Sequence, residues 1–145
     1  MNQTVQPGSR TGTVSIPASK SQAHRLLICA ALGQTPVTIR CLGISKDIAA
    51  TIGCLNALGA EIAVSGDLIT AKPIDAVPEG LCHLPCGESG STLRFLLPVA
   101  GALGVDTTFF LHGRLPQRPL SPLWEEMERM GARLSRPTGD TVRCQ

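Results

Sequence analysis

The sequence predicts an α/β (α+β) fold of two tandem units, each in the order strand, helix, strand, helix and β-hairpin. Apolar residues follow helical and strand periods in this same order twice along the 145 residues. The tripeptide ALG occurs at 31–33 and again at 102–104, a shift of 71, and GA occurs at 59–60 and again at 131–132, a shift of 72. A period near 70 is too long for common solenoid repeats and suits α/β units that bury helix faces against sheets.

The first unit is expected at about residues 17–78. Its elements, with the strand that precedes it, are strand 13–16, helix 20–32, strand 36–43, a helix from the N-cap Ser45 to Leu58, and a hairpin over 60–72. Gly33 and Gly59 follow the two helical patterns and predict their ends. Asp47 falls in the first turn of the second helix, where a negative charge is favourable.

The second unit is expected at about residues 79–145 and repeats the order. Its elements are strand 81–85, a Gly/Ser loop, helix 92–103, strand 106–113, a proline-rich segment 115–122, helix 123–132, and the strand pair 133–137 and 140–145. Together, residues 17–145 are expected to form one incomplete domain.

Composition and charge exclude several classes of protein. The formal net charge is +2, from 13 Lys and Arg against 11 Asp and Glu, so no field of one sign favours a nucleic-acid or membrane partner. Aromatic residues make up 3%, which leaves few platforms for stacking bases. The first 15 residues have no apolar signal-peptide core, and no apolar run reaches the roughly 18 residues of a membrane span. We therefore expect a cytoplasmic protein.

The six cysteines are expected to be reduced thiols, because no secretory signal precedes them. Cys82, His83 and Cys86 resemble one corner of a metal site. No second Cys/His pair at a suitable spacing completes four ligands, so no metal is expected.

Two predicted helix starts carry small polar and cationic residues. The shift of 71 aligns residues 19–21 (SKS) with 90–92 (GST), and both stretches lie where a helix begins. Unpaired backbone N–H groups and the helix dipole favour an anion there, and Gly87 and Gly90 let the backbone approach it closely. The pattern predicts a site for phosphate groups.

Side-chain cations extend this prediction. Arg25 lies one helical turn after Ser21, on the same face, and Lys20 reaches the same place. Arg114 and Arg118 lie in the segment that prolines stiffen, so a further cation can be held there. The alternative is that Ser19 only caps its helix while Lys20 and Arg25 are solvated charges.

Other motifs are weaker. Residues 87–91 (GESGS) resemble the G-x-S-x-G nucleophile elbow, but the last position is Ser91 and no convincing His/Asp partners follow. Neither loop is a Walker A motif. His24 and His112 are interpreted as structural or surface residues.

Four stretches, in order, resemble the 3-phosphoshikimate 1-carboxyvinyltransferase (EPSP synthase) family of the enolpyruvyl transferase fold. They are PASKSQAHRLLICAALG, SKDIAATIGCLNALGA, CGESGSTLR and RLPQRPLSPLWEEMERMGA. The resemblance spans essentially all 145 residues but only about the first third of such an enzyme. It implies domains of three βαβαββ units, with substrates in the cleft between two domains.

The resemblance also implies a reaction: transfer of the enolpyruvyl group of phosphoenolpyruvate to the 5-hydroxyl of shikimate 3-phosphate. This transfer belongs to the shikimate pathway, which leads to chorismate and the aromatic amino acids, and it needs no metal or organic cofactor. Lys20 would touch both substrates, Ser21 and Arg25 would hold shikimate 3-phosphate, and Gly90 and Arg118 would hold phosphoenolpyruvate.

Three other positions have uncertain roles by the same resemblance. Arg94 would add positive potential, and Asp47 matches a family acid near the cleft or is simply a first-turn helix charge. Glu88 departs from the family, which commonly has Asn at that place, and an acid there repels phosphate unless it turns away or pairs with a cation.

The resemblance places the family's acid, base and lysine of catalysis beyond Gln145, so no catalytic residue is assigned and the 145 residues alone are expected to be inactive. Residues 1–16 would pair with the distal domain that this length lacks. The family is typically monomeric, while this piece can self-associate. Alternatives are a non-catalytic anion-binding module and a relative of UDP-N-acetylglucosamine enolpyruvyl transferase, which normally has Lys-Asn where this chain has Lys20-Ser21.

Overall fold

The structure, a computed structural model, describes residues 3–135 and 139–145. The start of the expected segment 1–16 and the end of the expected strand 133–137 lie outside the described residues. The elements are α1 (Lys20–Ala31), β1 (Val37–Arg40), α2 (Lys46–Ala57), β2 (Glu61–Ser65), β3 (Leu68–Lys72), β4 (Cys82–Gly87), α3 (Gly90–Leu103), β5 (Thr107–Leu111), the 3-10 helix η1 (Leu115–Gln117), α4 (Leu123–Arg129) and β6 (Thr141–Cys144).

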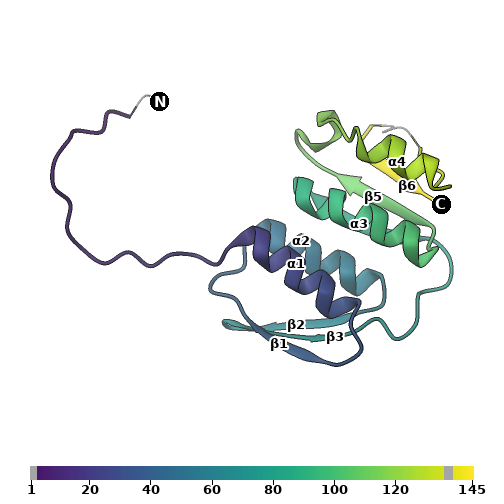
Figure 1. Cartoon of the computed structure of the whole chain (residues 1–145), viewed down its shortest axis with the longest axis horizontal. Coiled ribbons are helices and arrows are strands. Elements are labelled where there is room, and N and C mark those ends of the chain that lie inside the picture. Colours follow the sequence, from purple (N-terminus) through teal and green to yellow (C-terminus); the bar gives the residue numbers. More distant parts are fainter. Residues whose placement is uncertain (1–2, 136–138) are drawn as a thin grey trace.

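The strands form two three-stranded sheets that flank the helices (Figure 1). The first sheet has the order β1-β3-β2 and is antiparallel, with Ile39 opposite Ile69 and Val64 opposite Ile69. The second has the order β4-β5-β6, in which β4 and β5 are parallel and β5 and β6 antiparallel. The parallel pair is joined through α3, the crossover that parallel strands require.

Apolar side chains of both sheets and of the helices between them form one core cluster. The largest fully buried side chains include Leu27 of α1, Leu55 of α2, Leu96 of α3 and Phe109 of β5. Because α1, α2 and α3 contact one another, the core also fixes how these helices lie side by side.

Most expected elements are confirmed within a few residues, but the expected strand at 13–16 is wrong. The described residues before α1 form no strand and leave the body as an extended tail (Figure 1). Val14 and Ile16 are about four-fifths exposed, at 82% and 79%. A strand persists only when its backbone groups find a partner, and nothing described pairs with this stretch.

Three boundaries also differ from expectation. Helix α3 starts at Gly90, earlier than the expected Thr92, because Ser89 is its N-cap. Helix α4 ends at Arg129, before the expected residue 132. In place of the strand expected at 133–137, the described part shows a single bridge between Leu134 and Cys144.

Candidate anion-binding site

Three helices begin at the same end of the molecule, near the point where the tail leaves (Figure 1). Each is capped by a serine whose hydroxyl accepts a backbone N–H three residues later: Ser19 for α1, Ser45 for α2 and Ser89 for α3. Each cap satisfies one N–H of the first turn and leaves others to face outward. The side on which these helices begin is called here the helix-start surface.

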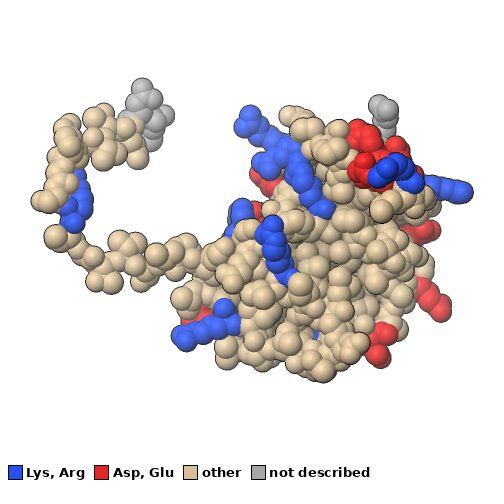
Figure 2. All heavy atoms as spheres, in the orientation of Figure 1, with Lys and Arg blue, Asp and Glu red and all other residues tan. Residues whose placement is uncertain are grey.

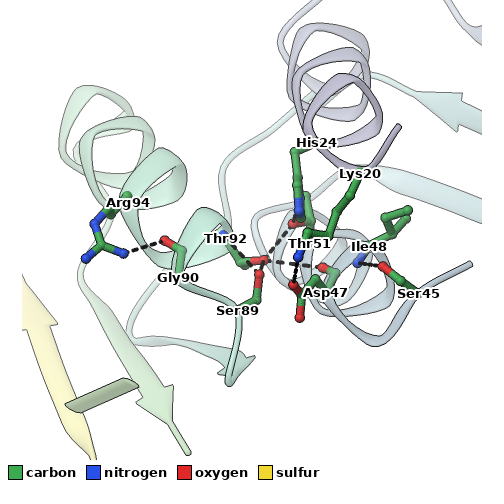
Figure 3. A network of polar contacts seen from close by, with 10 residues as sticks. All are labelled: Lys20, His24, Ser45, Asp47, Ile48, Thr51, Ser89, Gly90, Thr92 and Arg94. Carbon is green, nitrogen blue, oxygen red and sulfur yellow. Dashed lines mark hydrogen bonds and ion pairs between the residues drawn. The ribbon is translucent and has the colours of Figure 1, made fainter. Parts of the chain in front are cut away.

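Lys20 and Arg25 both lie at this surface. Lys20 Nζ lies 2.6 Å from Asp47 Oδ2, which joins the first turns of α1 and α2 (Figure 3). Arg25 donates to the Ser21 carbonyl at 2.9 Å and to the Ser21 hydroxyl, and its guanidinium lies 5.1 Å from the centre of the Phe95 ring. Ser21 and Arg25 are therefore in direct contact, whereas the side chain of Lys20 pairs with Asp47 of α2.

Gly90 is the contact point for two further cations. A Cβ atom placed on Gly90 would lie 2.7 Å from Nη1 of Arg94 and 3.2 Å from Nη1 of Arg118. Arg94 donates to the Gly90 carbonyl at 3.3 Å and to the Pro119 carbonyl at 2.8 Å, which ties α3 to the proline-rich segment. The start of α3 and two guanidinium groups therefore share one small region.

Glu88, the departure from the family pattern, lies against the backbone of Gly113. A Cβ on Gly113 would lie 2.7 Å from Oε1 of Glu88. Gly113 has a φ of +57°, so its backbone conformation also favours glycine. Arg114 lies next to it, is exposed, and flanks η1 without a side-chain capping bond.

A buried chain of hydrogen bonds runs beneath the helix-start surface. His24 Nδ1 lies 2.7 Å from Thr51 Oγ1, Thr51 Oγ1 lies 2.7 Å from Thr92 Oγ1, and the Thr92 hydroxyl donates to Ser89 Oγ at 2.7 Å (Figure 3). It links α1, α2 and the N-cap of α3. The Thr92 hydroxyl also contacts the Asp47 carbonyl at 3.4 Å.

The chain ends at an imidazole whose second nitrogen, Nε2, is buried without a hydrogen-bond partner. Burial holds the pKa of His24 below its ordinary value of 6.5; the Asp47 carboxylate raises it, while Lys20 and Arg25 lower it further. His24 is therefore structural, as expected, and neutral at pH 7.

Sequence reasoning missed Thr51 and Phe95 and misaligned the two helix starts. The N-caps Ser19 and Ser89 are 70 residues apart, so Lys20 corresponds to Gly90, whereas the shift of 71 had aligned Ser19 with Gly90. The extra residues lie inside α3, which has 14 residues against 12 in α1. The Ser-Gly pair at 89–90 is the sequence signal that could have predicted the start of α3, because serine is a common N-cap residue.

The metal interpretation of Cys82, His83 and Cys86 fits poorly with strand geometry. Side chains alternate along β4, so Cys82 and Cys86 are buried while His83 is exposed. A hydrogen bond with Cys54, together with burial, raises the pKa of the Cys86 thiol. All six cysteines are free, and the described residues contain no group of three potential metal ligands.

Lys and Arg side chains lie mainly over the side of the body that the tail leaves, whereas Asp and Glu gather mainly on the opposite side in the view of Figure 2. On the face shown, the charges are therefore unevenly distributed, which favours anions on one side of that face. None of the helices in the described part of the chain has the length and apolar character needed to cross a membrane.

Comparison with known proteins shows which family this chain matches. Residues 5–142 match the EPSP synthase (3-phosphoshikimate 1-carboxyvinyltransferase) family. A 3-phosphoshikimate 1-carboxyvinyltransferase of Clostridium beijerinckii is 37% identical over 146 residues, which cover 95% of this chain and 33% of that protein. The chain thus spans about a third of the length of the curated relatives it matches.

Solved structures agree on the fold. An EPSP synthase structure from Acinetobacter baumannii superposes with a TM-score of 0.76 at 20% identity, covering 91% of this chain and 31% of that one. The enolpyruvyl transferase NikO of Streptomyces tendae gives 0.50 at 16% identity, covering 85% and 29%. These matches show an incomplete domain of the enolpyruvyl transferase fold.

Proposed function

The chain belongs to the EPSP synthase family, and on that premise we propose that its helix-start surface forms part of the binding site for shikimate 3-phosphate and phosphoenolpyruvate. In the complete protein, the 5-hydroxyl of shikimate 3-phosphate adds to phosphoenolpyruvate, and the tetrahedral adduct then loses inorganic phosphate. The enolpyruvyl group is transferred without net oxidation or reduction.

The observation that carries this proposal is the meeting of Gly90 with Arg94 and Arg118 beside the start of α3. The guanidinium groups of Arg94 and Arg118 lie 2.7 and 3.2 Å from the position that a Gly90 Cβ would take. They therefore lie beside the backbone N–H groups of the first turn of α3. Such an arrangement matches the geometry and charge of a phosphate or carboxylate. In the proposal, the Gly90 N–H and Arg118 bind phosphoenolpyruvate.

Lys20, Ser21 and Arg25 hold shikimate 3-phosphate in this proposal, with Lys20 touching both substrates. The two substrates carry about five negative charges between them, so they approach each other only where fixed donors offset their repulsion. Arg25 is already oriented by its bonds to Ser21 and by the Phe95 ring. Holding both reactants also removes much of the entropic barrier to their reaction.

We propose the same domain organisation as the sequence predicts. Residues 17–78 and 79–145 are then two units of one domain, and residues 1–16 pair with a distal domain of the complete protein. The extended tail, with Val14 and Ile16 exposed, supports this role because apolar strand residues gain stability only when covered.

These 145 residues are proposed to bind but not to turn over substrate by themselves. The carboxylates noted at this surface are those of Asp47, paired with Lys20, and Glu88, packed against Gly113. Neither is placed as a free general acid or base beside the cations.

Titration of the 145-residue chain tests the proposal. Shikimate 3-phosphate, phosphoenolpyruvate and UDP-N-acetylglucosamine are added separately while amide signals of Lys20 and Gly90 are followed by NMR. Shikimate 3-phosphate is expected to shift both regions, and the UDP-sugar is not. If neither shikimate 3-phosphate nor phosphoenolpyruvate shifts these signals, the proposed site is refuted. Preference for the UDP-sugar would instead indicate a relative of UDP-N-acetylglucosamine enolpyruvyl transferase. Phosphate release measured with both substrates is expected to stay at background.

A further inference from the structure

We propose that the buried chain of hydrogen bonds from His24 through Thr51 and Thr92 to Ser89 holds the starts of α1 and α3 in the relative position that binds phosphate. These four residues are then positioning residues, which act on substrate only through the backbone and side chains of the helix-start surface. The inference rests on the proposed function of the helix-start surface.

The chain is continuous and crosses all three helices. Each of its three links measures 2.7 Å, and its four side chains are 0–1% exposed. Figure 3 shows it lying between Lys20 and Asp47 on one side and Gly90 and Arg94 on the other. It therefore connects the two groups of proposed ligands through the interior.

Stability alone gives little reason for such a chain. Apolar side chains of similar shape would pack the same helix interface without the cost of burying hydroxyl and imidazole groups. Apolar contacts also tolerate small slides between helices. A hydroxyl pair at 2.7 Å loses its hydrogen bond when the atoms separate by about 1 Å more, so the chain fixes the offset of the helices.

Both ends of the chain lead directly to the proposed ligands. Ser89 accepts from the Thr92 hydroxyl and, at 3.2 Å, from the Thr92 N–H, so the chain fixes the N-cap that precedes Gly90. At the other end, His24 lies one helical turn after Lys20 and next to Arg25 in α1. A change in the middle of the chain is therefore expected to reach both substrate sites.

The chain also has a direction, because each hydroxyl carries one proton. The Thr92 hydroxyl donates its proton to Ser89, so it accepts from the Thr51 hydroxyl, and Thr51 in turn accepts from His24 Nδ1–H. In this direction Nδ1 carries the ring proton and Nε2 carries none. Loss of the Thr51 hydroxyl removes the coupling, so the tautomer of His24 becomes a spectroscopic reporter of the intact chain.

Substitution of Thr51 in the 145-residue chain tests the inference. Thr51→Val keeps the shape and removes the hydroxyl, Thr51→Ser keeps the hydroxyl, and Thr107→Val is the matched control. Thr107 is also 0% exposed, and its hydroxyl donates to the Cys144 carbonyl in the second sheet. Affinity for shikimate 3-phosphate, amide signals of Gly90 and ring nitrogen signals of His24 are measured, with the free energy of unfolding for each variant.

We expect Thr51→Val to bind shikimate 3-phosphate about tenfold more weakly, as for one misplaced hydrogen bond to a charged group, and to shift the Gly90 and His24 signals without ligand. Thr51→Ser should restore both readouts. Thr107→Val should lose stability but keep affinity and signals. Thr51→Cys, which offers only a weak donor, replaces Thr51→Val if the latter does not fold.

The outcomes separate this inference from the proposed function. If the unmodified chain does not bind shikimate 3-phosphate, the proposed function fails, and the ligand-free Gly90 signals still decide the inference. Unchanged Gly90 signals in Thr51→Val, or wild-type affinity in that variant, would overturn it. An equal loss of affinity in Thr107→Val would also overturn it, because general destabilisation would then explain the effect.

Discussion

Gly90→Ala is the substitution for which the structure makes the sharpest prediction. The new Cβ would lie 2.7 Å from Nη1 of Arg94 and 3.2 Å from Nη1 of Arg118, both closer than ordinary contacts. Both atoms are the far ends of flexible side chains, so the guanidinium groups move rather than the backbone. We therefore expect the chain to fold and the proposed phosphoenolpyruvate site to be impaired.

The effect on stability is expected to be small. Gly90 is the first residue of α3, so the gain from alanine is smaller than inside a helix, where it is about 1 kcal/mol. Moving Arg94 breaks its bonds to the Gly90 and Pro119 carbonyls, which contribute about 0.5–1.5 kcal/mol each at most. These contributions oppose each other, so the free energy of unfolding should change by no more than about 2 kcal/mol.

The effect on binding is expected to be larger. Loss of one hydrogen bond to a charged group corresponds to about 1.5–3 kcal/mol, or roughly 10- to 150-fold in affinity. The assay is a titration of phosphoenolpyruvate against wild type, Gly90→Ala and Gly53→Ala. Gly53 lies inside α2 with nothing within 4 Å of its would-be Cβ, so its variant should gain stability and bind normally. Unchanged phosphoenolpyruvate affinity in Gly90→Ala would refute the placement of the site.

Three further predictions follow from single contacts. Arg25→Ala should weaken shikimate 3-phosphate binding by about 1.5–3 kcal/mol, measured by calorimetry of the chain or a completed enzyme, because it removes a charged donor. The pKa of His24 is lowered in the folded state, so the unfolded state takes up a proton first as the pH falls below 6.5. The free energy of unfolding, measured by urea titration, should therefore decline below that pH by up to about 1.4 kcal/mol per pH unit. Gly59→Ala should destabilise the fold by at least about 1–3 kcal/mol, because φ is +102° and the Cβ would lie 2.6 Å from a backbone carbonyl.

Each of these has its own control. Arg129→Ala removes an exposed surface ion pair and should leave affinity unchanged; equal losses in both arginine variants would return Arg25 to the role of a solvated charge. His83 is exposed, so His83→Gln should retain the decline in acid, whereas His24→Gln should flatten it. Gly66 has a positive φ but open space, so its alanine variant should lose less stability than that of Gly59.

Much of the fold follows from local patterns in the sequence. The helical periods that end at Gly33 and Gly59, and the hairpin pattern over 60–72, predict their elements within a few residues because those signals are local. The stretch at 13–16 has the residues of a strand but no partner in the described structure, and pairing is not a local property. The local pattern therefore predicts a strand there, and only the family resemblance indicates that its partner lies in a distal domain.

The proposed site could be predicted from the sequence as a set of candidate residues but not as a network. Lys20, Arg25 and Gly90 stand out because charge and glycine at helix starts have a direct physical meaning. Thr51 carries no such signal: a threonine in the middle of a helix has many uses, and its partners come from helices 27 residues earlier and 41 residues later. Only the packing of α1, α2 and α3 brings them together.

The carboxylates at the helix-start surface need not prevent anion binding. Asp47 lies 2.6 Å from Lys20, but the two side chains are 27% and 52% exposed, so the pair contributes little stability in water. A substrate with several negative charges and several hydrogen bonds can displace it, and Lys20 then changes partner rather than losing one. Glu88 is packed against Gly113, where no ion pair is found for it among the described residues. The guanidinium groups of Arg25, Arg94 and Arg118, for which no ion pair is found in the part of the chain that the structure describes, therefore keep this surface positive, so it can bind an anion although Asp47 and Glu88 lie there.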